Sequence, residues 1–371
     1  MNFDFSDDQK LLQQTARDFL DEHSPLSVCR EVLESDAPYS QSLWKGAAEL
    51  GWLGVTVPEI YGGAGFGHLE AAVIAEEVGR ALAPIPFSSS VYFATEALLV
   101  AGTDDQKKRY LPGLAAGDTV GTFALTEKPG QNGTEQVEAR CEGAKITGSK
   151  LPVYDGDIAD FAVVAAQGEG GLSLYLVPLG AEGVERTPIR SIDPSRSAAS
   201  VRFDGASAEL LGEAGRGGAL ADAILDRAAV LQGFEQLGGA TRALEITRQF
   251  TLERYAFGKP IASFQGIKHR LADLWCEIEL ARSNCYYGAW ALSNEEPALG
   301  VAACLARVQA SRAFDQTCVE MIQLHGGVGY TWEYDCHLFY RRARLTSAAL
   351  GNPASWREKL ITRLEAAQRA A

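Results

Sequence analysis

The chain lacks any long apolar run, and nothing in it approaches the ~20 consecutive apolar residues that a membrane-spanning helix needs. Its first residues, M-N-F-D-F-S-D-D-Q, contain no basic leader and no signal-peptide pattern. We therefore expect a cytoplasmic protein without a membrane span.

Thiols and imidazoles are also scarce. The seven cysteines are odd in number and never stand in a C-x-x-C spacing, and the five histidines show no spacing typical of metal ligands. Several cysteines lie in apolar helical stretches, which favours buried, reduced thiols. We expect neither a disulfide framework nor a metal site.

Positive charge is in short supply. The 34 Lys and Arg residues stand against 48 Asp and Glu residues, which gives a formal net charge of −14. This balance argues against a nucleic-acid-binding surface. Any anionic ligand would need a local group of basic residues that opposes the field of the whole chain.

Helical and strand-like segments are present in a clear order. The 371 residues, 46% of them hydrophobic, are enough for a large core and two or three domains. Ser6 is a suitable N-cap for a first helix, and residues 71–83 have helical periodicity before Pro84. Strand-like runs such as D-F-A-V-V-A-A fill the middle of the chain, and helical patterns return from about residue 218.

The pattern predicts an α+β protein with three domains. These are an N-terminal α-helical domain at 1–118, a middle β-domain at 119–217 and a C-terminal α-helical bundle at 218–371. The long helical pattern at 220–254 contains Gly238 and Gly239, which together cost ~2 kcal/mol relative to alanine. Close helix packing is the expected reason for this pair.

Two segments carry the chemistry. Residues 254–265 read R-Y-A-F-G-K-P-I-A-S-F-Q, so an arginine ends a helix, a turn follows at Phe257-Gly258, and a new helix starts at Gln265. Residues 323–330 read Q-L-H-G-G-V-G-Y. An arginine offers a fixed fork of donors to a phosphate, and glycines let backbone N–H groups approach anionic oxygens. Together they favour a long phosphate-bearing cofactor on a helical surface.

In this order the segments resemble the acyl-CoA dehydrogenase family, and the resemblance covers nearly the whole chain. The matching segments are G-W-L-G-V-T-V-P-E-I-Y-G-G-A-G-F-G at 51–67, F-A-L-T-E at 123–127 and the helix end with its turn at 242–265. The resemblance implies an N-terminal helical domain, a small central β-barrel-like domain and a C-terminal four-helix bundle. It also implies FAD as cofactor, an acyl-CoA substrate and an electron-transfer flavoprotein or similar acceptor.

The family's binding residues carry over to positions of this chain that match its motifs. By resemblance, Arg254 would meet the pyrophosphate of an FAD held mainly by a neighbouring subunit, and Phe257 and Gln265 would flank that cofactor. Residues of the second segment would line its adenosine half; these are Gln323, Gly326 and Gly327. Thr126 remains from the loop that binds a subunit's own flavin.

The residues expected at the catalytic base differ from the family pattern. Relatives remove the α proton of the thioester with a Glu, either just after the last bundle helix or early in the long helix. Those two places hold Leu350 and Ala228 here. Asp226, which precedes an arginine, and Glu235 are weak substitutes, and each is more simply explained as an ion-paired or solvated acid. The two acids lie about 180° apart on a helix, so they cannot both face one site.

The flavin segments of the β-domain are also altered. The loop after Thr126 reads E-K-P-G-Q-N-G-T-E, and the Trp-Ile-Thr segment of relatives is replaced by residues that include Pro152 and Tyr154. A proline at this place removes a backbone donor. The segments that a subunit would use on its own flavin are thus degraded, whereas those it lends to a neighbour are kept.

This pattern resembles the short, base-less subunit of bacterial heteromeric acyl-CoA dehydrogenases, which typically act on steroid side-chain thioesters. We expect a tetramer built as a dimer of dimers, because the lent segments and the apolar face L-A-D-L-W-C-E-I-E-L at 271–280 need partner surfaces. Two alternatives stay open. One is a self-sufficient homomeric dehydrogenase that uses Glu235 or Asp226, and the other is a non-catalytic scaffold on the same fold.

Overall fold

The computed structural model describes residues 5–128, 130–131, 133–134 and 136–370. Backbone contacts divide the chain into two compact units. Unit 1 comprises Met1–Glu31, Ala72–Ala83 and Ala229–Ala371, and unit 2 comprises Val32–Ala71 and Pro84–Ala228. Three helices, α2 (Leu26–Glu34), α4 (His68–Arg80) and α7 (Gly217–Glu253), contribute residues to both units.

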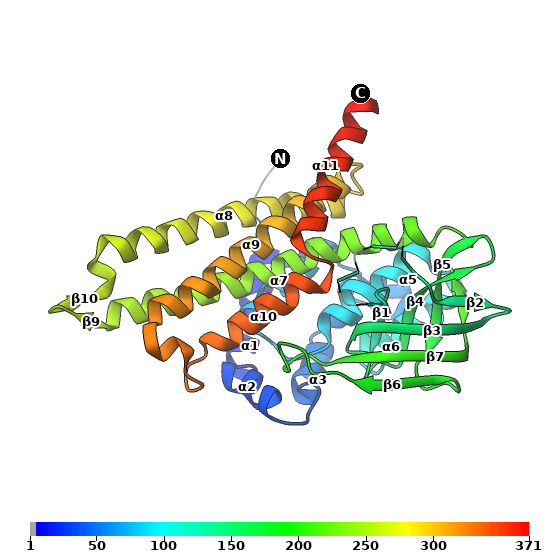
Figure 1. The fold of residues 1–371 in the computed structure, drawn as a ribbon, viewed down its shortest axis with the longest axis horizontal. Helices are drawn as coiled ribbons and strands as arrows, with labels where there is room; N and C mark the ends of the chain where they lie inside the picture. Colours follow the sequence, from blue (N-terminus) through cyan, green and yellow to red (C-terminus); the bar gives the residue numbers. More distant parts are fainter. Residues whose placement is uncertain (1–4, 129, 132, 135, 371) are drawn as a thin grey trace. The chain divides into compact units, whose positions relative to one another are not determined.

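Unit 1 is helical (Figure 1). Its helices besides parts of α4 and α7 are α1 (Asp7–His23), the first part of α2 (Leu26–Glu34), α8 (Gln265–Ser293), α9 (Leu299–His325), α10 (Cys336–Ala349) and α11 (Pro353–Ala370). The long helix α9 packs against α8, α10 and α11. Between α7 and α8 the chain forms the hairpin β9 (Tyr255–Ala256) and β10 (Lys259–Pro260), followed by the 3₁₀ turn η4 (Ile261–Ser263).

Glycines let α4 and α7 cross with their backbones in contact. A Cβ atom added at Gly238 would lie 1.8 Å from the carbonyl oxygen of Glu76, and one at Gly79 would lie 1.8 Å from that of Glu235. A Cβ at Gly239 would lie 2.5 Å from the ring of Phe314 on α9. The expectation that close packing explains the Gly238-Gly239 pair is therefore confirmed.

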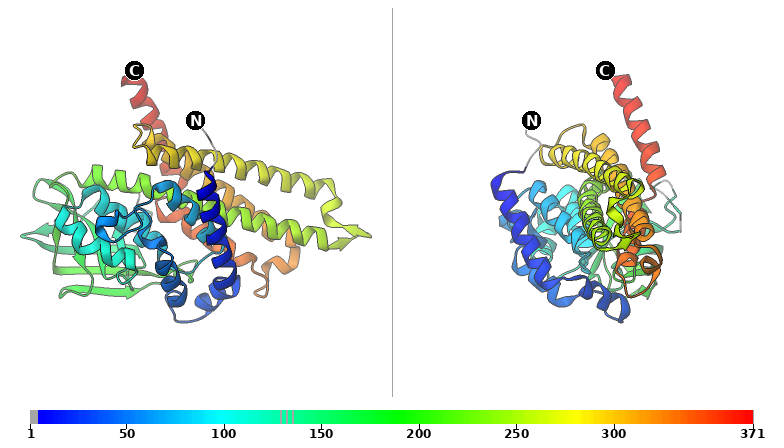
Figure 2. Two further views of the ribbon diagram at one scale, coloured as in Figure 1. Left: turned by 180° about the vertical axis from the view of Figure 1, so that it is seen from behind. Right: turned by 90° about the vertical axis from the view of Figure 1, so that its left-hand side faces the viewer.

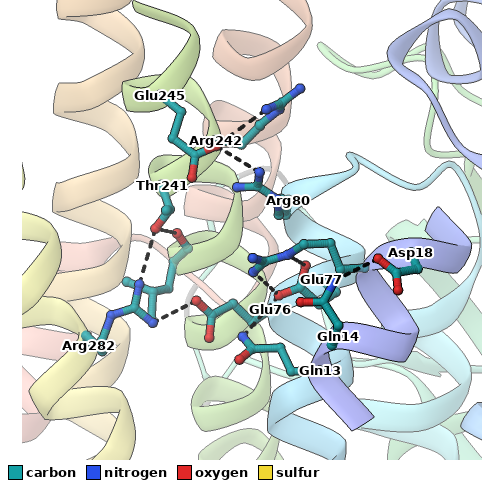
Figure 3. A network of polar contacts seen from close by, with 12 residues as sticks. Gln13, Gln14, Asp18, Glu76, Glu77, Arg80, Thr241, Arg242, Glu245 and Arg282 are labelled. Carbon is teal, nitrogen blue, oxygen red and sulfur yellow. Dashed lines mark hydrogen bonds and ion pairs between the residues drawn. The ribbon is translucent and has the colours of Figure 1, made fainter. Parts of the chain in front are cut away.

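Ion pairs join α4 to three other helices of unit 1 (Figure 3). Glu77 contacts Arg17 of α1 at 2.7 Å, and Glu76 contacts Arg282 of α8 at 2.7 Å. At the end of α4, Arg80 binds Glu245 of α7 at 2.8 Å. Burial raises the pKa of Glu76 even though Arg282 opposes the shift. These ion pairs fix the register of α4 within unit 1.

Unit 2 combines short helices with a mixed sheet. Its helical segments are the end of α2, α3 (Gln41–Glu49), η1 (Trp52–Gly54), η2 (Glu59–Tyr61), the start of α4, the π-helix η3 (Ser88–Thr95), α5 (Glu96–Ala101), α6 (Asp104–Ala116) and the start of α7. Its strands are β1 (Gly121–Ala124), β2 (Arg140–Glu142), β3 (Lys145–Tyr154), β4 (Phe161–Gly168), β5 (Gly171–Pro178), β6 (Val184–Pro188), β7 (Ala198–Ser207) and β8 (Glu209–Leu211).

The strands follow the order β6-β7-β3-β2-β4-β5-β8, and β1 pairs with β4 in parallel. The first six residues of β4, F-A-V-V-A-A, are all buried, as expected for a central strand that is covered on both faces. Its antiparallel partner β5 is matched from Phe161 opposite Pro178 to Gly168 opposite Gly171.

The predicted order of helical domain, sheet and helical domain is confirmed. Ser6 caps α1 and forms a capping box with Gln9, and the long pattern before Arg254 is the single helix α7. The helix expected at 71–83 starts earlier, at His68, and ends at Arg80. The exact division at 118 and 217 stays a prediction.

The cysteines are free thiols. Six are buried, at positions 29, 141, 285, 304, 318 and 336, and Cys276 is exposed. Burial raises the pKa of Cys285 to about 12, so that thiol is inert at neutral pH. Among the described residues, no helix is long and apolar enough to cross a bilayer.

Candidate cofactor-binding site

The hairpin after α7 presents Arg254 at the end of unit 1. The Arg254 N–H donates to Phe250 O at 2.9 Å and so finishes the helix, while its carbonyl accepts from Ile261 N at 2.8 Å and closes the hairpin. The side chain of Arg254 is exposed. The backbone around the arginine is therefore fixed, whereas the guanidinium remains open to a ligand.

Phe257 has an unfavourable backbone conformation. The pairing of Ala256 with Lys259 leaves Phe257 and Gly258 as a two-residue turn, and their φ angles of 53° and 78° fit the primed turn type that hairpins favour. A positive φ suits Gly258 but strains a bulky residue such as Phe257. The Phe257 side chain is also 95% exposed. The ring meets that of Phe264 edge-on, with centroids 6.2 Å apart, and most of its surface stays open to a contact from outside the chain.

The second segment forms the 3₁₀ turn η5 (Gly326–Tyr330) directly after α9. Gly326 has φ 65°, which favours glycine, and Gly329 lies too close to Ile322 O for a side chain. Gly327 has neither constraint, because a Cβ at this position would meet no atom of the chain within 4 Å. The open space at Gly327 fits the close approach of a ligand to the backbone.

The two segments lie at the same end of unit 1. Helices α8 and α9 are antiparallel neighbours, and Arg270 near the start of α8 contacts Glu320 near the end of α9 at 3.0 Å. Both views of the ribbon place the β9–β10 hairpin and the end of α9 at one end of the helices (Figures 1 and 2). Gln265, the first residue of α8, and Gln323, in the last turn of α9, are both exposed there.

An aromatic stack supports η5 from behind. The buried ring of His325 stacks on Phe250 with centroids 4.1 Å apart, and its Nδ1 donates to Met321 O at 2.7 Å. Burial lowers the pKa of His325, so this ring is neutral and its other nitrogen carries no proton. The stack joins the end of α7 to the end of α9 and holds the two binding segments together.

In unit 2, Thr126 lies in a loop whose shape is fixed by a buried ion pair between Glu127 and Lys150, which we call the clasp. The Thr126 carbonyl accepts from Leu151 N at 2.8 Å. The Glu127 carboxylate accepts from Lys150 Nζ at 2.7 Å and from the backbone N–H groups of Glu138 and Ala139. Part of the altered loop, at residues 129, 132 and 135, lies outside the described residues.

The environment of the clasp shifts the pKa of both Lys150 and Glu127. Lys150 is fully buried, and burial lowers its pKa from 10.5 to about 8, against the opposing effect of Glu127. Burial alone would raise the pKa of Glu127, but the hydrogen bonds from Lys150 and the two backbone N–H groups hold it below its usual range. Glu127 therefore serves the loop itself and is not free for a ligand.

The two places where the resemblance leads us to expect the base are buried and apolar. Ala228 is fully buried on α7, and Leu350, directly after α10, is 7% exposed. The Leu350 carbonyl accepts from Trp356 Nε1 at 2.8 Å. Neither alanine nor leucine can accept a proton, so the described residues offer no base at either place.

A buried arginine holds the segment around Leu350. Arg307 of α9 donates to the carbonyl oxygens of Thr346 and Ser347 at 2.9 Å and of Gly351 at 3.3 Å. These carbonyls end α10, where a positive charge is favoured by the helix dipole. Arg307 also donates to Gln236 of α7 at 3.1 Å. The segment around Leu350 is thus well anchored without a carboxylate at that position.

The two substitute acids are buried within helices. Glu235 is 2% exposed, and its Oε1 lies 3.9 Å from Nη1 of the equally buried Arg342. This contact supports the explanation of Glu235 as an ion-paired residue of the bundle. Asp226 is 7% exposed. The arginine beside it, Arg227, is committed to the buried Glu96 at 3.3 Å, so the pair does not reproduce the family's Glu-Arg arrangement.

Sequence reasoning did not anticipate the Glu127–Lys150 clasp, the Arg307 anchor or the His325 stack. Their partners are distant in the chain, so periodicity carries no signal for them. The one available hint was a charged residue inside an apolar helical or strand pattern, as at Arg307 and Lys150, because such a residue is buried only with partners.

Known proteins are similar to this chain in sequence and in fold over nearly its full length. The sequence models of the acyl-CoA dehydrogenase N-terminal and C-terminal domains match residues 6–118 and 215–364. Acyl-CoA dehydrogenase IpdE2 of Mycobacterium tuberculosis is 32% identical over 360 residues, which cover 97% of this chain and 96% of that protein. The chain belongs to the acyl-CoA dehydrogenase family.

Solved structures of the family superpose closely. The ChsE4–ChsE5 complex from Mycobacterium tuberculosis matches with a TM-score of 0.88 at 26% identity, covering 98% of this chain and 99% of that one. A variant of the Tcur3481–Tcur3483 steroid acyl-CoA dehydrogenase matches with a TM-score of 0.87 at 30% identity, covering 98% and 99%.

The family consists of FAD-dependent oxidoreductases that act on the CH–CH group of acyl-CoA thioesters. The end of unit 1 fits this cofactor in three respects. Arg254 offers a bidentate donor for a phosphate, Gly327 leaves its backbone open, and Phe257 exposes a ring that can cover an apolar part of the ligand.

Proposed function

We propose that this chain is the base-less subunit of a heteromeric acyl-CoA dehydrogenase, which lends the Arg254 and Gln323 segments to an FAD held mainly by a complete partner subunit. The observation that carries the proposal is the contrast between two kinds of site in one chain. The lent segments are intact and exposed, whereas the places of the base are filled by buried, apolar Leu350 and Ala228.

The similar structures support a heteromer. Two of them are complexes of two different chains, ChsE4–ChsE5 and Tcur3481–Tcur3483, and the latter is a steroid acyl-CoA dehydrogenase. By analogy we propose a partner of the same family and a bulky, steroid-type acyl group. The electrons would leave to an electron-transfer flavoprotein or a similar acceptor.

FAD, when bound, would accept the hydride from the β carbon while a carboxylate takes the α proton. The residues of this chain would contribute binding and orientation. Arg254 would contact the pyrophosphate and offset part of its charge, and Gln265 would flank the cofactor. The residues that would line its adenosine half are Gln323, Gly326 and Gly327. Phe257 would lose its solvent-exposed surface against the cofactor.

A homomeric enzyme with Glu235 or Asp226 as base is the second candidate. The 3.9 Å contact between Glu235 and the buried Arg342 weighs against Glu235, because it pairs the carboxylate with a cation inside the bundle. A non-catalytic scaffold would not explain the strained backbone at Phe257 or the open space beside Gly327. We therefore prefer the heteromer.

The proposal also includes a cytoplasmic location, which the free thiols of the cysteines support.

Co-expression with candidate partner chains tests the proposal. FAD absorbance per protein should be low for this chain alone and should rise to a fixed ratio when a complete subunit co-purifies. A chain that is fully loaded with FAD when purified alone would support the homomeric candidate instead.

A further inference from the structure

Unit 1 contains a cavity of ≈ 770 Å³ between the second half of α7, the end of α9 and the start of α10. Of the described residues that line it, none belongs to the set proposed to contact FAD. The buried and half-buried part of the lining is apolar and aromatic, and consists of Ile246, Phe250, Met321, His325 and Cys336. The cavity is therefore a recess separate from the proposed cofactor contacts.

His325 presents a hydrogen-bond acceptor to this cavity. The residue lines the cavity and is only 6% exposed. Its Nδ1 donates to Met321 O at 2.7 Å, so in the neutral ring Nε2 carries a lone pair. Among the described residues, Nε2 has no hydrogen-bond partner. A donor that enters the cavity would supply the missing hydrogen bond.

Three aromatic rings surround this acceptor. Phe250 stacks on His325 with centroids 4.1 Å apart. Tyr334 meets both rings edge-on, with its centroid 6.3 Å from that of Phe250 and 6.1 Å from that of His325. The Tyr334 side chain is 40% exposed, so part of its ring is open to a ligand. The face of an aromatic ring attracts a cation.

Half of the carboxylates in the lining are engaged by arginines of the chain. Glu245 contacts Arg80 at 2.8 Å and Arg242 at 3.4 Å. Asp335 contacts Arg30 at 2.7 Å. These ion pairs leave Glu245 and Asp335 with little charge to offer a ligand.

The other charged residues of the lining favour a cation. They are Glu253, Glu333 and Arg248, which are two carboxylates and one guanidinium. Hydrogen bonds from its own backbone N–H and from the Thr331 hydroxyl lower the pKa of Glu333, so this carboxylate is ionised at neutral pH. The net charge of −14 on the whole chain acts in the same direction.

We propose that this cavity binds a guanidinium or ammonium group, carried either by a small organic amine or guanidine or by a basic side chain of the complete partner subunit. An N–H of the cation donates to His325 Nε2, the rings of Phe250 and Tyr334 cover its faces, and Glu253 and Glu333 offset its charge. The site is independent of the proposed FAD contacts, and its occupation can be measured without flavin.

The first test compares two probes of the same shape by isothermal titration calorimetry of the full chain. Phenylguanidine is a planar cation at neutral pH, and phenylurea is its neutral counterpart. Phenylguanidine should bind roughly tenfold more tightly, because a charge-assisted hydrogen bond is stronger than a neutral one. Equal binding of the two probes, or no binding of phenylguanidine, overturns the proposal. Adenosine is the third probe, and tighter binding of adenosine would assign the cavity to a neutral heterocycle instead.

The second test locates the bound cation with variants. Glu333→Gln should weaken phenylguanidine binding roughly twofold to fivefold, as expected for an exposed ion pair. Glu365→Gln is the matched control, because it removes the same charge from an exposed position on α11 and should leave binding unchanged. Equal affinities of these two variants overturn the proposal.

His325→Phe removes the acceptor while it keeps a ring against Phe250. It should weaken phenylguanidine binding at least about tenfold, since a hydrogen bond to a charged group is lost. Thermal unfolding shows whether this variant is folded, and the Glu333 and Glu365 variants decide the matter if it is not. Wild-type affinity in a folded His325→Phe chain contradicts the proposed role of Nε2.

The source of the cation is identified by repeating the titration on the complex with a complete subunit. Loss of phenylguanidine binding in the complex assigns the site to a basic side chain of that subunit. Binding that persists in the complex assigns it to a small organic cation.

Discussion

At the scale of single residues, Arg254 is the proposed FAD contact with the most direct chemical role. Arg254→Ala should lower FAD occupancy of the partner complex without changing its thermal unfolding, because the guanidinium is exposed and its backbone hydrogen bonds remain. The lost charge-assisted contact should cost ~1.5–3 kcal/mol of FAD binding. FAD titration by fluorescence quenching measures this.

Arg254→Lys serves as the control for charge alone. It should also bind FAD weakly, because lysine cannot reproduce the planar fork of donors. Wild-type affinity in both variants would remove Arg254 from the site.

Glu127 and Lys150 should respond unequally to substitution. Glu127→Gln leaves the fully buried Lys150 ammonium without its carboxylate and should cost roughly 3–5 kcal/mol of unfolding free energy. Lys150→Met should cost less, since Glu127 keeps its hydrogen bonds from the N–H groups of Glu138 and Ala139. Urea unfolding of the two variants compares them, and a larger loss for Lys150→Met would contradict the account of the clasp.

The ion pair of Glu127 and Lys150 should also make the stability of the fold depend on pH. Folding lowers the pKa of Lys150 from 10.5 to about 8, so the unfolded chain binds more protons between these values. Stability contributed by this group therefore rises as pH increases from about 8 to 10.5, and below pH 8 the burial penalty is fully present. Relative to the wild type, Lys150→Met should gain stability toward pH 8, and a difference that does not change with pH would argue against the lowered pKa.

Some residues of the candidate site can be identified from the sequence, whereas others depend on distant partners. Arg254, Phe257 and the glycines of η5 could be chosen as candidates because they stand in short local motifs, and their cofactor role stays a prediction. Partners such as Glu127 and Lys150, which are 23 residues apart, depend on how strands pair, and a pattern of residue types does not encode that pairing.

At the scale of elements, two glycines of unit 1 should behave in opposite ways. Gly238→Ala should destabilise the chain by several kcal/mol, since its Cβ would lie 1.8 Å from Glu76 O and neither backbone can move freely at the α4–α7 crossing. Gly327→Ala should leave unfolding unchanged, because its Cβ meets nothing, but it should lower FAD occupancy. Thermal unfolding and flavin absorbance of both variants test the pair.

Each of the two glycine variants serves as the control for the other. If Gly327→Ala destabilises the fold as much as Gly238→Ala does, its glycine serves packing and not a ligand. If Gly238→Ala is tolerated, the two helices do not cross at backbone contact.

The sequence predicted elements better than their ends. The helix that starts after Ser6 and the long helix α7 follow from capping and periodicity. The start of α4 at His68 was missed by three residues, because the polar residues His68 and Glu70 stand before the apolar pattern that begins at Ala71. The π-helix η3 has no simple sequence signal, since its run S-S-S-V-Y-F-A-T favours no single periodicity.

At the scale of the whole molecule, the chain has half of what its family's reaction requires. Unit 1 presents the end that we propose to bind FAD, whereas buried Leu350 and Ala228 stand at the two places where the resemblance leads us to expect the base. General-base catalysis contributes roughly 10²–10⁴-fold to such a proton transfer. A chain without it should turn over very slowly unless a partner supplies the carboxylate.

The most direct test is the rate of acyl-CoA dehydrogenation by the purified chain, measured with an artificial electron acceptor, with and without a complete partner subunit. The account predicts turnover near background for the chain alone and full turnover for the complex, and that turnover should be lost when the partner's base is replaced by glutamine. Ordinary turnover by the chain alone, abolished by Glu235→Gln or by Asp226→Asn, would contradict the account and identify the base.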